Sequence, residues 1–200
     1  MNYYVVETDK HKLIQKTAGV KARQDVETIF KWNNFKKIEI PCLIEGRENK
    51  TRLGKIKAHY DVYMLWKNAL KKIKKNDWIY IQFPLLEHTM LFSLLIKNLE
   101  KRGIHTSIII HDVEAIRFTL RNDVPLSRKI RMRFEEISSF KNCSKIIVHN
   151  EKMKSFMHEK WKIHKDKMDI LGIFDYLVEN YNEELLEKRN LSRKGPVIIA

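Results

Sequence analysis

Short apolar runs rich in β-branched and aromatic residues alternate along the chain with longer segments of helical period. The short runs predict β-strands, and the longer segments predict amphipathic helices. We expect six strands, at residues 3–7, 36–40, 78–83, 106–111, 145–149 and 168–172. We expect helices at residues 22–34, 53–73, 88–103, 126–140, 151–161 and 177–190. Alternation of this kind predicts an α/β domain with a parallel sheet and helices on both of its faces.

The last residues of the sequence predict the start of a further structural unit. Gly195 and Pro196 precede an apolar run at residues 197–200, which has the character of a strand. We therefore expect residues 1–192 to form one domain, and residues 193–200 to be a linker and the first strand of a missing second domain.

Polar side chains follow several predicted strands directly. Gln82 lies near the end of the third strand, His111 and Asp112 close the fourth, and His149 and Asn150 close the fifth. The carboxyl ends of parallel strands meet at one edge of a sheet, where open α/β folds bind their ligands. We expect this edge to hydrogen-bond a polyhydroxylated or phosphorylated ligand.

Structural roles explain the same residues individually. Asp112 is placed to cap a helix by accepting a hydrogen bond from the backbone of Glu114 or Ala115. Glu114 and Arg117 are spaced to form an ion pair within one helix. Asn150 is placed to cap the helix that follows it. Their joint placement along one edge favours a binding role, while the structural roles stay open.

The chain is strongly basic, with 39 Lys and Arg against 25 Asp and Glu and a formal net charge of +14. This charge favours an acidic partner such as nucleic acid, anionic lipid headgroups or a phosphorylated substrate. Lysines are spread over nearly every predicted helix, so solvated helix faces explain much of the positive charge. The densest basic cluster is at residues 128–134. No nucleic-acid-binding motif accompanies the charge, so a basic nucleic-acid-binding module is the weaker alternative and we expect no nucleic-acid partner.

Several classes of protein are disfavoured by what the sequence lacks. Its two cysteines, Cys42 and Cys143, are far apart and have no zinc-site spacing, so we expect no metal and a reduced, cytoplasmic protein. We expect no secretory signal and no membrane span, because the first residues lack a signal pattern and no apolar run reaches the length of a span. The loop predicted after the first strand has the single glycine Gly19 and no GxGxxG, and no P-loop or GxSxG motif occurs.

Seven motifs, in order and spacing, resemble the amino-terminal half of bacterial sugar transferases with the GT-B architecture. They are YYVVET, AGVKARQDVETIF, KKIEIP, IYIQFP, IIIHDVEAIR, KIIVHNEKMKSFM and LGIFDYL. The closest resemblance is to the adhesin glucosyltransferases of the glucosyltransferase 3-like type and to the β-1,6-galactofuranosyltransferases. The resemblance extends over almost the whole chain.

This resemblance implies a Rossmann-like domain that shapes the acceptor side of an interdomain cleft. It implies transfer of a hexosyl or galactofuranosyl group from a UDP-sugar, bound mainly by the missing domain, to a glycan, glycoprotein or lipid-linked acceptor. It implies no cofactor or metal, and it allows a homo-oligomer and contact with the anionic inner membrane surface. Asp112 is the expected catalytic base, with His111 second. The residues expected to line the acceptor side are Thr17, Gly19, Gln82, Glu114, Arg117, His149 and Asn150.

The chain departs from many GT-B enzymes in the loop after the first strand. Those enzymes carry several glycines there, whereas this loop has only Gly19. An acceptor-gating role for residues 9–24 is therefore expected in place of phosphate binding. The alternative to an enzyme is a non-catalytic scaffold subunit of a glycosyltransferase complex, and the isolated domain is expected to be inactive without its second half.

Overall fold

A computed structural model describes residues 1–8, 18–43, 51–118, 123–172 and 177 of the chain. In these ranges six strands form one parallel sheet in the order β2-β1-β3-β4-β5-β6. The strands are β1 (Asn2–Thr8), β2 (Lys36–Pro41), β3 (Trp78–Phe83), β4 (His105–Ile110), β5 (Lys145–Val148) and β6 (Met168–Ile170). The predicted α/β class and its parallel sheet are confirmed.

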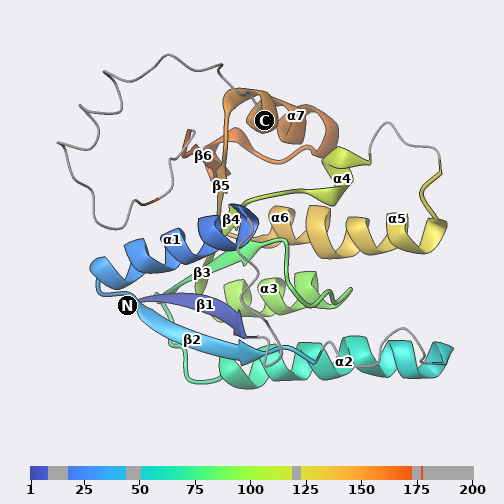
Figure 1. Cartoon of the computed structure of the whole chain (residues 1–200), viewed down its shortest axis with the longest axis horizontal. Helices are drawn as coiled ribbons and strands as arrows, with labels where there is room; N and C mark the ends of the chain where they lie inside the picture. Colours follow the sequence, from blue (N-terminus) through green and yellow to red (C-terminus); the bar gives the residue numbers. More distant parts are fainter. Residues whose placement is uncertain (9–17, 44–50, 119–122, 173–176, 178–200) are drawn as a thin grey trace, which may run out of the picture.

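Helices cover both faces of the sheet, as expected for right-handed crossovers between parallel strands. They are α1 (Ala18–Trp32), α2 (Arg52–Ala69), α3 (Phe92–Lys101), α4 (Glu114–Arg117), α5 (Leu126–Met132), α6 (Ser138–Asn142) and α7 (Glu151–Trp161). A 3-10 turn, η2 (Lys165–Lys167), precedes β6. Figure 1 shows α1 on one side of the sheet and α2 and α3 on the other. The arrangement is Rossmann-like.

Alternation along the strands divides the core into two clusters. Tyr4 and Ile109 face α1 and pack with Val26 and Phe30, while their neighbours Val5 and Ile108 belong to the larger cluster. Successive strand residues point to opposite faces, so one strand supplies both clusters. The larger cluster contains side chains from α2, α3, α6 and α7.

The helix expected at residues 126–140 is interrupted by a π turn, η1 (Arg133–Ile137), between α5 and α6. Glu135 and Glu136 lie in this turn, and both are fully buried. A π turn is wider than an α-helical turn, so adjacent residues lie closer to one face. The prediction of one regular helix was wrong here because two neighbouring carboxylates both face inward.

Other element boundaries also differ from those expected. Helix α1 begins at Ala18 rather than at residue 22, and α3 begins at Phe92 rather than at residue 88. The last strand ends at Ile170. Residues 178–190 of the last expected helix and the expected terminal strand at 197–200 lie outside the described residues. No helix within the described ranges is long and apolar enough to cross a membrane.

We predict that Phe140→Ala lowers the free energy of unfolding by about 3–5 kcal/mol. Phe140 is fully buried, and its ring lies 5.2 Å from that of Phe83 and 6.2 Å from that of Trp161. Truncation would leave a cavity between the sheet and the helices. Urea unfolding of the two proteins measures the loss.

Phe134→Ala is the matched control, because Phe134 lies in the preceding turn of the same helical segment but is 51% exposed. It is expected to change the stability by less than about 0.5 kcal/mol. Equal losses in the two variants would contradict the packing described for α6.

Candidate functional site

The candidate site lies at the carboxyl edge of the sheet, where the strand order changes direction. β1 pairs with β2 on one side and with β3 on the other, and the chain then continues outward through β4 and β5. Loops on the two sides of β1 therefore diverge at this edge. Open α/β sheets bind ligands at this switch point.

A chain of hydrogen bonds joins the ends of β3, β4 and β5. The side-chain amide of the buried Gln82 donates to the backbone oxygen of Arg23 at 3.4 Å. Its oxygen lies 2.8 Å from Nε2 of His111, so this ring nitrogen is the one that carries the proton. Nε2 of His149 in turn donates to the backbone oxygen of His111 at 3.3 Å. Three residues expected at this edge are therefore connected.

His111 is uncharged at neutral pH. Burial lowers its pKa, and electrostatic effects of Arg23 and the neighbouring His149 lower it further, to about 4. The imidazole consequently presents one N–H and one nitrogen lone pair. Such a ring is suited to hydrogen bonds with neutral hydroxyl groups rather than to binding an anion.

Glu7 and Arg23 complete the switch point. Glu7 was not expected from the sequence, whereas Arg23 lies within residues 9–24, the segment expected to gate the acceptor. The carboxylate of Glu7 accepts hydrogen bonds from the backbone amides of Leu86 at 2.7 Å and Glu87 at 3.1 Å. The guanidinium of Arg23 donates to the backbone oxygen of Pro84. Both side chains line a cavity of about 150 Å³ together with Gln82. Burial raises the pKa of Glu7 to about 7, against the opposing effects of its two backbone hydrogen bonds and of Arg23.

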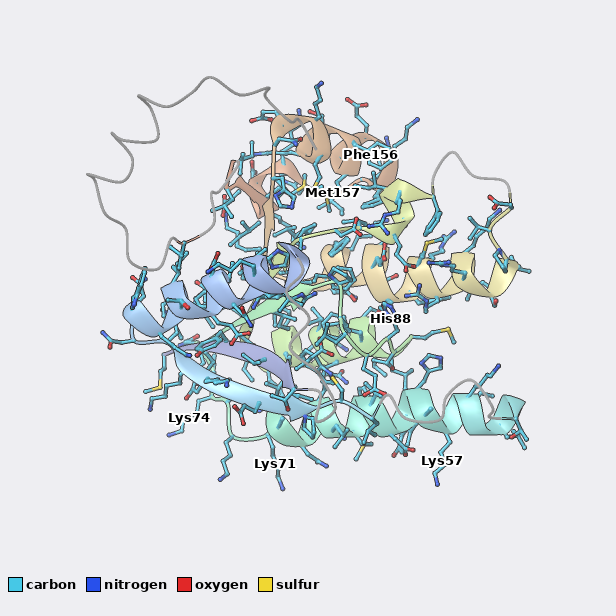
Figure 2. All side chains as sticks on the ribbon, in the orientation of Figure 1. Lys57, Lys71, Lys74, His88, Phe156 and Met157 are labelled. Atoms are coloured by element: carbon cyan, nitrogen blue, oxygen red, sulfur yellow. The ribbon has the colours of Figure 1, made fainter. Side chains whose placement is uncertain are left out.

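His88 forms a carboxylate–imidazole pair beyond the end of β3. Its Nδ1 contacts Oε1 of Glu135, and Arg131 donates to the same oxygen at 3.1 Å. Glu135 is fully buried, whereas the His88 side chain is 33% exposed. In the view of Figure 2, His88 lies between the ribbons of α5 and α2. Nδ1 is the ring nitrogen that faces the carboxylate, and Nε2 is the second ring nitrogen.

A family model, the N-terminal domain of glucosyltransferase 3-like proteins, matches residues 2–173. The chain belongs to this family. The resemblance drawn from the seven motifs is confirmed at this level, and the family indicates a glycosyltransferase with sugar donor and acceptor substrates. No curated protein matches the chain.

In this glucosyltransferase 3-like domain, Asp112 does not cap α4 in the expected way. Its carboxylate accepts a hydrogen bond from the backbone amide of Val113 at 2.8 Å. The amides of Glu114 and Ala115 instead donate to the carboxylate of Glu136, at 3.2 and 2.8 Å. Val113 occupies the cap position and has no polar side chain, so a distant glutamate supplies the acceptor. The helix-cap prediction was therefore wrong.

The expected ion pair between Glu114 and Arg117 is also wrong. Arg117 turns back and pairs with Asp112. Glu114 pairs with Arg128 at 3.0 Å and with Arg131, and these arginines lower its pKa although burial opposes them. Helix α4 has only four residues, so its two charged ends meet partners outside the helix.

Three further residues were expected to line the acceptor side: Asn150, Gly19 and Thr17. Asn150 caps α7 by accepting a hydrogen bond from the amide of Met153 at 2.9 Å, which confirms its structural role. Gly19 lies in the first turn of α1 rather than in a loop, which corrects that prediction. Thr17 lies outside the described residues, as does the part of the expected gating segment that precedes α1.

Polar residues on otherwise apolar faces were the signals that sequence reasoning missed. Glu7 shares its strand face with Val5, and Glu135 and Glu136 fall on the inward stripe of their helix. Charged residues at such positions need a partner, so they indicate a network. Within the described residues, no cluster of three or more His, Cys, Asp or Glu side chains could hold a metal ion.

We predict that Glu136→Gln reduces the loss of stability that the protein undergoes as the pH rises. Burial raises the pKa of Glu136 to about 7 from 4.5. The folded state therefore holds this proton more tightly than the unfolded chain does. The resulting stabilisation is full below about pH 4.5 and is lost as the pH rises to about 7, a change of up to about 3 kcal/mol. Urea unfolding at pH 5 and pH 8 measures it.

Glu39→Gln serves as the control for this experiment. Glu39 is exposed, and the hydrogen bond from Lys37 lowers its pKa, so it titrates below the range tested. Its removal is expected to leave the difference between pH 5 and pH 8 unchanged. If Glu136→Gln also leaves that difference unchanged, the assignment of a raised pKa to Glu136 is wrong.

Proposed function

We propose that the chain forms the acceptor side of a GT-B glycosyltransferase. The donor is a UDP-sugar that supplies a hexosyl or galactofuranosyl group, and residues outside the matched region hold most of it. The acceptor is a hydroxyl group of a glycan, a glycoprotein or a lipid-linked sugar. We propose no cofactor, and the nucleoside diphosphate is the leaving group.

The observation that carries this proposal is the hydrogen-bonded chain from Gln82 through His111 to His149 at the switch point. Its members are amide and imidazole groups, and His111 is neutral at pH 7 because its pKa is about 4. The uncharged Gln82 amide and His111 imidazole match sugar hydroxyl groups, which also carry no charge. The family match supports a sugar as the ligand.

Glycosyl transfer needs a base that removes the proton of the attacking hydroxyl group. Asp112 and His111 are candidates because both lie at the carboxyl edge. The carboxylate of Asp112 is held by Arg117 and by the amide of Val113, so it would have to give up an ion pair to accept a proton. His111 has a pKa of about 4, which makes it a weak base at neutral pH.

His88 meets the chemical requirements better. Its side chain is partly exposed beyond the end of β3, and its Nδ1 contacts Glu135. We propose Nε2 as the nitrogen that takes the proton. In the proposed step the acceptor oxygen bonds to the anomeric carbon while the bond from that carbon to the diphosphate breaks. The hydroxyl proton moves to Nε2 of His88. The buried carboxylate of Glu135 then stabilises the imidazolium.

We predict that His88→Ala lowers kcat for sugar transfer about 10²- to 10⁴-fold without weakening binding of the UDP-sugar. Added imidazole should restore part of the rate, because it can enter the space left by the ring. Glu135→Gln should also reduce the rate and should move the pH profile of kcat. Transfer of a radiolabelled sugar by the full-length gene product measures the rate, and calorimetry measures donor binding.

His164→Ala is the matched control, because it removes a histidine that is 74% exposed and lies after α7. It should transfer sugar at the wild-type rate. Full activity in His88→Ala, together with inactivity in Asp112→Asn, would move the role of base to Asp112. A wild-type protein that transfers no sugar from any UDP-sugar would refute the proposed function and favour a scaffold subunit.

A further inference from the structure

α5 and the turn that follows it expose a face that combines cations with large apolar side chains. Leu126, Lys129, Ile130, Arg133 and Phe134 recur at spacings of three and four residues and so share one side of the helix. Leu126 is 73% exposed, Ile130 40% and Phe134 51%. Lys129 and Arg133 are exposed between them. The apolar side chains therefore face solvent beside positive charge.

A groove of about 510 Å³ extends this face toward α4 and the end of α7. Its apolar lining includes Phe118, Met132 and Trp161. Four cationic residues also line it, and no acidic residue of the described chain does; the cations are Lys129, Arg133, Lys141 and Lys160. We call the groove and the outward side of α5 together the α5 face.

The arginines and lysines of this region divide into two groups. Arg128 and Arg131 turn inward and neutralise Glu114 and Glu135. The four cations of the groove form no ion pair with any residue that the structure describes. Among the described residues no carboxylate neutralises their charge, which favours binding of an external anionic surface.

We propose that the α5 face docks on the surface of an anionic lipid bilayer. Helices that lie in a membrane interface combine exposed Leu and Phe with Lys and Arg, as this face does. Leu126, Ile130 and Phe134 would enter the boundary between headgroups and acyl chains, and Lys129 and Arg133 would contact lipid phosphates. A nucleic acid would use the cations, but it would leave the aliphatic side chains in water.

Docking in this way would hold the carboxyl edge of the sheet beside the bilayer. Helix α4 borders the groove and follows β4 almost directly, so the strand end that carries His111 lies near the docked face. A lipid-linked acceptor would then be within reach of the candidate site. The docking itself rests on the α5 face and does not require the transferase activity.

Flotation with lipid vesicles tests the proposal on the full-length gene product. We expect binding to vesicles of phosphatidylcholine with phosphatidylglycerol, and not to vesicles of phosphatidylcholine alone. The double variant Lys129→Gln/Arg133→Gln should bind about tenfold more weakly or worse, since both charges meet the headgroups. Leu126→Ser, which keeps the charge, should bind more weakly at high salt as well as at low salt.

The double variant Lys71→Gln/Lys74→Gln removes the same charge from another place. Both lysines are exposed, and Figure 2 shows them on the opposite side of the view from α7. This control should bind anionic vesicles within about twofold of the wild type. Equal weakening in both double variants would show that the net charge, and not the α5 face, drives binding, and would overturn the proposal.

Three further outcomes would overturn it. The first is no binding of the wild-type protein to anionic vesicles. The second is that the protein binds a DNA duplex more tightly than the vesicles and that Lys129→Gln/Arg133→Gln abolishes this DNA binding. That result would assign the face to nucleic acid. The third is a dimer in solution that Leu126→Ser dissociates, which would assign the face to a second copy of the chain.

Discussion

Two adjacent carboxylates, Glu135 and Glu136, hold the candidate site together from inside the π turn. Burying two neighbouring carboxyl groups is costly, so each needs partners that replace water. The carboxylate of Glu136 accepts hydrogen bonds from the first backbone amides of α4, and the carboxylate of Glu135 pairs with Arg131 and His88. One turn of helix therefore fixes both the segment after β4 and the loop after β3. This double attachment positions His88 and the start of α4 at the carboxyl edge.

How well the sequence predicts an interaction at this site depends on how far apart the two partners lie in the sequence. Strand periodicity placed Gln82 and His111 at the same edge, because the carboxyl ends of parallel strands coincide. The partners of Glu114 were mispredicted, since local spacing suggested Arg117 whereas Arg128 and Arg131 lie on α5. Asp112 was expected to cap α4, but it pairs with Arg117 at the end of that helix. The pairing of His88 with Glu135 joins residues 47 positions apart, and only the packed structure brings them into contact.

The basic cluster at residues 128–134 shows why the net charge alone was uninformative. Within one helical turn, Arg131 faces inward to carboxylates while Lys129 and Arg133 face outward. Helical period decides which charges are neutralised inside the protein, because residues two positions apart point in different directions. The outward pair adds to a surface potential, whereas the inward arginine contributes to the fold.

The charges at the carboxyl edge also bear on where a donor diphosphate can bind. Arg23 donates to the oxygen of Pro84 and lies beside Glu7, and Arg117 is paired with Asp112. Arg128 is likewise paired, with Glu114. Stabilising a diphosphate takes cations or amides that are not already bound to carboxylates. Among the described residues of this edge, Arg117 and Arg128 have such partners and Arg23 is bound to a backbone oxygen, so the edge is better matched to hydroxyl groups. This match supports the proposed division of labour, in which this edge would orient the acceptor and other residues would hold the nucleotide.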